Sequence, residues 1–156
     1  MDMREENPMA NTRLTVVVRK DLQMPPGLLA AQVCHMADAF MRTKINQRFM
    51  VVSEKGMPET PLNSPPDTKT CSDLFQPEEL SWMQQPYLSV LAVNCYEDLL
   101  VIKEHAVREA LPIQCWNDIV PSPTLSDNSI KAFVGVAIGP ADFDKIKIVT
   151  GSLEAY

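Results

Sequence analysis

The sequence predicts an α/β sandwich with a four-stranded mixed sheet. Three apolar segments have the composition of strands, at about residues 14–18, 87–94 and 111–116. Two segments with a helical spacing of apolar residues lie between them, at about 28–41 and 96–110. This alternation is typical of a mainly parallel sheet. A fourth strand at about 132–138 follows the third by a loop too short for a crossover helix, so it should run antiparallel to the third.

The first strand and helix organise the rest of the chain. Residues 14–18 are mostly β-branched and uncharged, as in a strand that is buried on both faces. The charged residues 19–21 come where this strand should end, and Pro25 and Pro26 exclude a helix before them. The helix that follows carries no charge until Asp38, so both of its faces are expected to be covered.

Two further segments are predicted to lie outside the regular core. Residues 1–11 are polar and acidic, and we interpret them as a flexible tail. Residues 44–76 are rich in Pro, Ser and Thr and lack an apolar period, so they are expected to form a largely irregular insertion. A short helix should begin at Pro77, because Pro favours the first turn and Glu78 and Glu79 follow it.

Composition and charge favour a cytoplasmic protein. No stretch of about 18 apolar residues is present, so no membrane span is expected. The net charge of −6 argues against a broadly basic surface for nucleic acid. The cysteines lack any spacing typical of a zinc site, and no cofactor is expected. Cys34, Cys95 and Cys115 lie in apolar elements and are predicted to be buried, reduced and slow to react.

A ligand site is expected beyond the carboxyl ends of the strands, where open α/β sheets bind their ligands. Residues 19–21, Asn94, and Asn117 with Asp118 follow three strands and should meet there, facing the start of the first helix. Gln32 and His35 share one face of that helix. Two interpretations stay open for each side chain: Gln32 and His35 are either core residues or site residues, and Asp118 either caps a loop or acts in chemistry.

The amino-acid sequence at both ends of the chain resembles family 2 of the peptidyl-tRNA hydrolases, the archaeal and eukaryotic type. The resemblance rests on four motifs: Arg19-x-Asp21-Leu22-x-Met24-x-x-Gly27, Ala30-Ala31-Gln32-x-x-His35, Ile138-Gly139-Pro140-Ala141-Asp142 and Val149-Thr150-Gly151-x-Leu153-x-x-Tyr156. It implies a three-layer α/β/α fold over residues 12–156. It also implies hydrolysis of the ester that joins a peptide to the 3′ end of tRNA, with peptidyl-tRNA as partner. A homodimer is compatible with the sequence.

The resemblance also assigns site residues and shows where the chain departs from the family. The catalytic residues that the resemblance implies are Asp118, Ser122, Gln32 and His35. The expected substrate-binding residues are Arg19, Asp21 and Gly27 from the family motif, with Lys20 and Asn117 added because they follow strand ends. Two family lysines correspond to Pro26 and Leu28, a basic residue corresponds to Pro121, and a threonine corresponds to Val134. Two functions therefore stay open: a divergent hydrolase, or a non-catalytic member that binds a protein or a small ligand in the same crevice.

Overall fold

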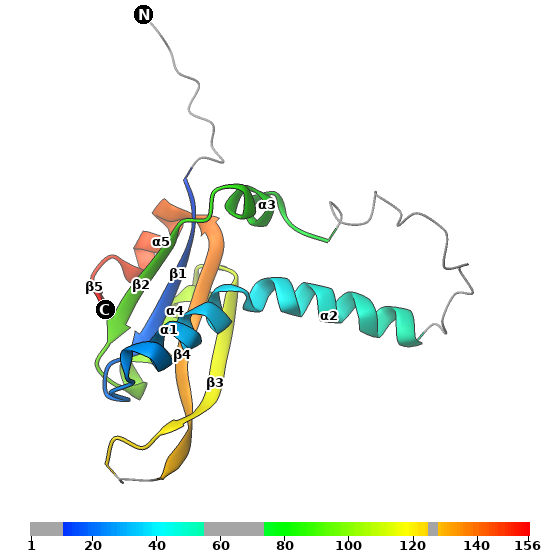
Figure 1. Ribbon diagram of the computed structural model, residues 1–156. Coiled ribbons are helices and arrows are strands. Elements are labelled where there is room, and N and C mark those ends of the chain that lie inside the picture. Colours follow the sequence, from blue (N-terminus) through cyan, green and yellow to red (C-terminus); the bar gives the residue numbers. More distant parts are fainter. Residues whose placement is uncertain (1–10, 55–73, 125–127) are drawn as a thin grey trace, which may run out of the picture.

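The computed structural model describes residues 11–54, 74–124 and 128–156. The expected tail, apart from residue 11, and the part of the expected insertion at 55–73 lie outside these ranges. The described residues form a mixed α/β structure around one open sheet (Figure 1).

The sheet has five strands in the order β3-β4-β1-β2-β5. Their bounds are β1 Thr12–Arg19, β2 Leu88–Val93, β3 Ile113–Pro121, β4 Ser129–Asp142 and β5 Glu154–Ala155. β1 and β2 are parallel, whereas β4 runs antiparallel to both β1 and β3, so the predicted mixed sheet and antiparallel fourth strand are confirmed. The prediction of four strands is wrong, because the two-residue β5 pairs with the edge of β2 and is too short to have an apolar pattern.

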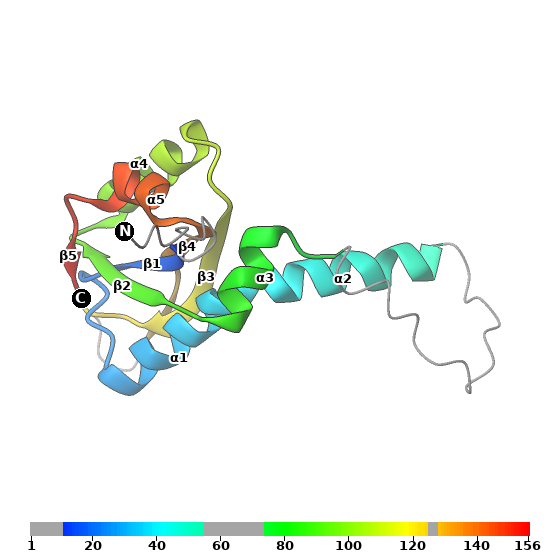
Figure 2. The ribbon, with the colours of Figure 1, turned by 90° about the horizontal axis from the view of Figure 1, so that it is seen from above.

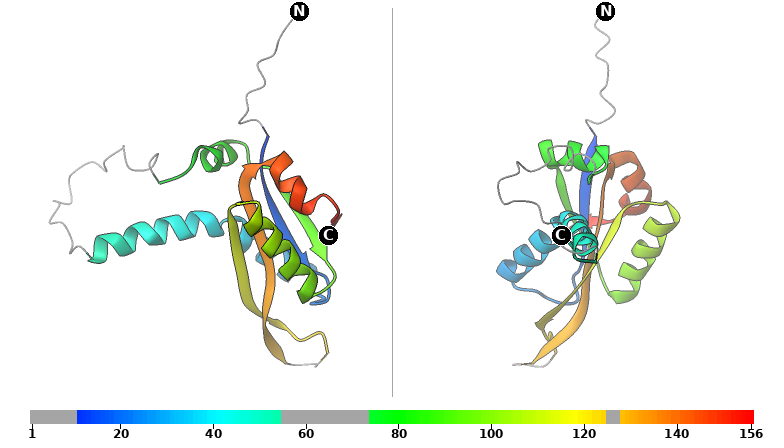
Figure 3. Two further views of the ribbon diagram at one scale, coloured as in Figure 1. Left: turned by 180° about the vertical axis from the view of Figure 1, so that it is seen from behind. Right: turned by 90° about the vertical axis from the view of Figure 1, so that its right-hand side faces the viewer.

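Helices cover both faces of the sheet (Figure 2 and Figure 3). Their bounds are α1 Pro26–Ala37, α2 Ala39–Glu54, α3 Pro77–Gln84, α4 Tyr96–Arg108 and α5 Phe143–Thr150. α1 and α3 pack on one face and α4 and α5 on the other, while α2 extends away from the sheet. No helix in the described ranges is long and apolar enough to cross a membrane.

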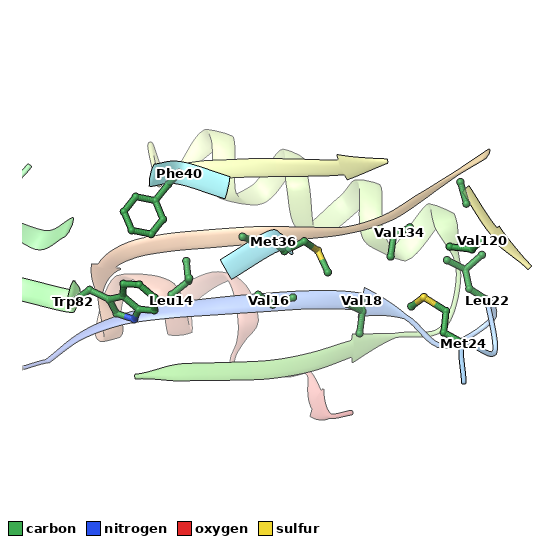
Figure 4. Close-up of a cluster of buried hydrophobic side chains, with 12 residues drawn as sticks. Leu14, Val16, Val18, Leu22, Met24, Met36, Phe40, Trp82, Val120 and Val134 are labelled. Atoms are coloured by element: carbon green, nitrogen blue, oxygen red, sulfur yellow. The ribbon is translucent and has the colours of Figure 1, made fainter. Parts of the chain in front are cut away.

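β1 is buried on both faces, as predicted. Val16 and Val18 join the cluster under α1 and α3, which also contains Met36 and Trp82 (Figure 4). Val17 points the other way, into the cluster under α4 and α5. Each of these three valines has no exposed surface, and burying one such side chain contributes about 1.5–3 kcal/mol. β1 is therefore the common wall of two apolar cores.

A glycine on β4 lets α1 approach the sheet closely. Gly135 is paired with Val18 on one side and with Trp116 on the other. A Cβ atom at this position would lie 2.5 Å from the carbonyl oxygen of Val17 and 2.9 Å from Sδ of Met36, a residue of α1. The missing side chain thus leaves room for the carbonyl oxygen of Val17 and for Met36, which packs from α1 onto the sheet.

The expectation that both faces of the first helix are covered is wrong. Only Gln32 and Met36 of α1 are buried, and Ala30, Ala31 and His35 are exposed. α1 packs on the sheet with its inner face, and small uncharged residues on an outer face need no cover.

The prediction of buried thiols is also wrong for two cysteines. Cys34 and Cys115 are exposed, whereas Cys95 is half-buried. Cys34 lies on the outer side of α1, and Cys115 lies on β3, which is an edge strand. An edge strand has no neighbour beyond it, so an apolar sequence does not ensure burial there.

Two boundaries differ from the prediction. The chain from Ala39 to Glu54 is helical, although irregular structure was expected from residue 44 onwards. This stretch contains neither Gly nor Pro, and the first such residue is Gly56, so nothing in it breaks a helix. β3 continues past Trp116 to Pro121, because its pairing with β4 extends to Ser129 even though polar residues interrupt the apolar run.

Candidate active site

A buried glutamine joins α1 to β3 at the carboxyl end of the sheet. Nε2 of Gln32 donates a hydrogen bond to Oδ2 of Asp118 at 2.8 Å. Oε1 of the same amide accepts a hydrogen bond from the indole Nε1 of Trp116 at 2.6 Å. Gln32 is only 2% exposed. Gln32 is therefore buried, as a core residue would be, and its amide also contacts Asp118 directly.

Asp118 is held as an ionised carboxylate. Its pKa lies below the ordinary value of an aspartate, first because Gln32 donates to it and second because the backbone N–H of Ile119 donates to Oδ1 at 2.7 Å. Partial burial acts in the opposite direction, and His35 contributes a smaller lowering. Within the described part of the chain each oxygen accepts one of these hydrogen bonds, and a carboxylate oxygen can accept two. The carboxylate therefore retains capacity for a water molecule or a substrate donor.

An aromatic stack lies beside this carboxylate. The ring of His35 stacks on the ring of Trp116, with centroids 5.4 Å apart and an angle of 21° between the planes. The guanidinium carbon of Arg42 lies 5.2 Å from the centroid of Trp116, and Arg42 donates to the carbonyl oxygen of His35 at 2.6 Å. The exposed His35 ring is thus fixed against the half-buried Trp116.

Trp116 and Arg42 were not among the site residues predicted from the sequence. Trp116 lies two residues before Asp118 on the same strand, and this period of two places both side chains on one face of a sheet. That spacing could have indicated Trp116. Arg42 lies seven residues after His35, a helical spacing, but the sequence did not show that the helix breaks at Asp38.

For three of the expected substrate-binding residues, none of the described contacts reaches Asp118. Arg19 and Asp21 pair with each other, through Nε to Oδ1 at 2.9 Å and Nη2 to Oδ2 at 2.5 Å. The hydrogen bond to Asp21 raises the pKa of Arg19, and Arg19 also donates to the carbonyl oxygen of Phe133. The third residue, Asn117, pairs with Phe133 on the α4 side of the sheet, whereas Asp118 pairs with Ala132 on the α1 side.

Lys20 lies in a separate crevice. This crevice has a volume of about 400 Å³, and Lys20, Asn94, Asp98 and Leu153 are among the residues that line it. It lies at the carboxyl ends of β1 and β2, whose following helices pack on opposite faces of the sheet. Lys20 lies 3.8 Å from Glu154, at the β5 edge, and Asp118 lies on the opposite edge strand. The polar residues after three strands were expected to lie at one place, but they lie at two separate places.

The remaining two expected residues, Gly27 and Ser122, make no described contact with Asp118. Gly27 is at the exposed start of α1, and a Cβ atom there would have no neighbour within 4 Å. Ser122 follows the end of β3, and its backbone N–H donates to the carbonyl oxygen of Asn128. Four residues of strand span about 13 Å, so Ser122 and Asp118 are far apart along the β3–β4 hairpin.

Among the described residues, no three His, Cys, Asp or Glu side chains gather at metal-binding distance. The model of the family described as peptidyl-tRNA hydrolase PTH2 matches residues 12–156. The chain belongs to this family. The resemblance found at both ends of the sequence is thereby confirmed, and the family match spans all the site residues above. No curated protein has a detectable match to the sequence.

Proposed function

We propose that this member of the PTH2 family hydrolyses the ester between a peptide and the 3′ end of tRNA at the Gln32–Asp118 site. The observation that carries the proposal is the buried Gln32, which spans from α1 to β3 and holds one oxygen of Asp118. Family membership supports the substrate class. Both ends of the buried amide are hydrogen-bonded, so its burial is compensated, and its NH₂ group is directed at Asp118.

The proposed reaction needs an attacking water and a route for its proton. The water oxygen attacks the ester carbonyl, the bond to the 3′ oxygen breaks, and that oxygen takes up a proton. Asp118 orients the water through its free lone pairs, because a carboxylate with a lowered pKa is a good acceptor of hydrogen bonds but a weak base. We assign the proton transfer to His35, because its exposed imidazole can accept and donate protons and lies one turn from Gln32 on α1. For Ser122, support comes from its correspondence to the family threonine alone.

A second candidate function is non-catalytic binding, and the loss of the family cations favours it. The positions of the two family lysines hold Pro26, which is exposed, and Leu28, which packs against the core. Arg19 is neutralised by Asp21, and Arg42 lies 2.8 Å from Asp38. Phosphates are bound largely through Lys and Arg, so these changes reduce the attraction for tRNA.

Cleavage of a purified peptidyl-tRNA by the full chain, with tRNA binding measured on the same sample, separates the two candidates. Release of free peptide and intact tRNA at a rate above the spontaneous rate supports the hydrolase. Binding of peptidyl-tRNA or another ligand without any release supports the second candidate and contradicts the first. The cytoplasmic location and the homodimer considered from the sequence stay predictions.

A further inference from the structure

The amide of Gln32 lies between two groups that can each form only one kind of hydrogen bond. The indole N–H of Trp116 is a donor and has no acceptor. The ionised carboxylate of Asp118 is an acceptor and has no donor. Oε1 of Gln32 lies 2.6 Å from the indole nitrogen, and Nε2 lies 2.8 Å from Oδ2 of Asp118. A single orientation of the amide satisfies both neighbours.

The reversed amide would be opposed on both sides. A rotation of 180° about the last side-chain bond exchanges the oxygen and nitrogen of a glutamine with almost no change of shape. It would place the NH₂ group against the indole N–H, and the carbonyl oxygen against the carboxylate of Asp118. Gln32 is 2% exposed, so water does not compensate either contact.

Trp116 is itself held in place. Its ring stacks on His35 and carries the guanidinium of Arg42 at 5.2 Å from the centroid. It lies on β3 opposite Gly135, two residues from Asp118 and on the same face. The donor and the acceptor on either side of Gln32 therefore belong to one strand, and their spacing is set by the backbone.

We propose that Trp116 is a positioning residue that acts on Asp118 through Gln32. Its indole N–H holds the amide oxygen, which directs the NH₂ group at Asp118 and keeps this carboxylate ionised and fixed. The consequence for catalysis rests on the proposed function, but the effect on Asp118 itself does not. Without the indole donor, the amide oxygen is a buried acceptor with no partner, and Gln32 turns away to find one.

The test measures the pKa of Asp118 by NMR of its side-chain carboxyl carbon during a pH titration of the full chain. Trp116→Phe keeps a ring against His35 and removes the donor. Its expected result is a rise in the pKa of Asp118 towards the ordinary value of an aspartate. Gln32→Leu should raise it at least as much. The double variant should show the Gln32→Leu value with no further rise, because the indole acts only through the amide.

Trp82→Phe is the matched control. The indole of Trp82 also donates a hydrogen bond, to the carbonyl oxygen of Tyr87 at 2.8 Å, and its side chain belongs to the same core cluster. Its indole bonds to Tyr87 and not to Gln32, whose described partners are Asp118 and Trp116, so its loss should leave the pKa of Asp118 unchanged. An equal rise in Trp116→Phe and Trp82→Phe would overturn the proposal, because general loosening of the core would then explain both.

A measurement on the unaltered protein covers the case in which Trp116→Phe does not fold. The NMR signal of the Trp116 indole N–H should shift with the same midpoint as Asp118, while the Trp82 indole N–H should show no such midpoint. A Trp116 signal that ignores the titration of Asp118 overturns the proposal. A coupled titration in a protein that cleaves no peptidyl-tRNA supports the positioning role and contradicts the proposed function alone.

Discussion

The amide of Gln32 lies 2.8 Å from the carboxylate of Asp118, and these two residues are 86 positions apart in the sequence. This contact joins the first helix to the edge strand β3. The contact depends on the packing of α1 against the sheet, where Gly135 leaves room for Met36. It also depends on the face of β3 from which Asp118 points.

Gly135→Ala should destabilise the protein by about 1–3 kcal/mol, because the added methyl group overpacks the space under α1. The new Cβ atom would lie 2.5 Å from a backbone oxygen that cannot move aside easily. Gly27→Ala is the matched control on α1 itself. It meets no atom within 4 Å, so its effect should be neutral or stabilising by up to about 1 kcal/mol. Urea unfolding of the two variants and the unaltered protein measures both values, and equal stabilities would contradict the close packing.

Acid should remove the stability that the Asp118 hydrogen bonds supply. The pKa of Asp118 is lowered in the folded protein, so the unfolded chain binds a proton first as the pH falls. The contribution is therefore complete above about pH 4, the ordinary value for an aspartate, and is lost as the pH falls through the folded pKa. The difference in unfolding free energy between the unaltered protein and Asp118→Asn should shrink from pH 7 to about pH 2. A difference that is constant with pH would count against a lowered pKa.

Thiol labelling should distinguish the three described cysteines. Cys34 and Cys115 are exposed, so they should react with a thiol reagent about as fast as a small free thiol in solution does. Cys95 should lag behind them. The backbone N–H of Asp98 lowers its pKa, but burial and the neighbouring carboxylates of Glu97 and Asp98 raise it more, which leaves less thiolate. Mass spectrometry of the labelled peptides over time provides the order, and Cys95 labelling first would contradict the structure.

Restoring the family cations should strengthen tRNA binding. Pro26→Lys with Leu28→Lys places two positive charges at the start of α1, near the Asp118 site. The dependence of affinity on salt should steepen by about one to two phosphate contacts. Val101→Lys with Val107→Lys is the control, because both valines are exposed on α4, on the opposite face of the sheet. An equal gain in both double variants would show that net charge, and not the position, attracts tRNA.

The sequence predicted the parts of the fold that depend on apolar pattern. The buried β1 and the antiparallel fourth strand follow from residues 14–18 and from the short loop before β4. β5 has two residues and exists only because β2 offers it an edge, so no local signal could predict it. α2 was missed between residues 44 and 54 because its length outside the core depends on the absence of helix breakers rather than on an apolar face.

The candidate site was predicted in part for a similar reason. Gln32, His35 and Asp118 were expected at one place and lie together, whereas residues 19–21 and Asn117, which the strand ends suggested as neighbours, make no described contact with Asp118. Neighbouring residues of a strand point to opposite faces, so Asn117 and Asp118 could not share one face. The register of β3 against β4 decides that Asp118, paired with Ala132, is the one on the α1 side. Trp116 was counted as an apolar strand residue. Its indole N–H becomes important only when α1 places Gln32 over it.

The rate of peptidyl-tRNA cleavage by Asp118→Asn, compared with the unaltered protein, tests the central claim most directly. Asp144→Asn is the matched control, since Asp144 is an exposed residue of α5 on the far face of the sheet. A group that positions water or a proton contributes about 10²–10⁴-fold to a rate, so Asp118→Asn should lose that factor while Asp144→Asn keeps the full rate. An unchanged rate in Asp118→Asn, with the variant shown to be folded, would contradict the assignment of the reaction to this carboxylate.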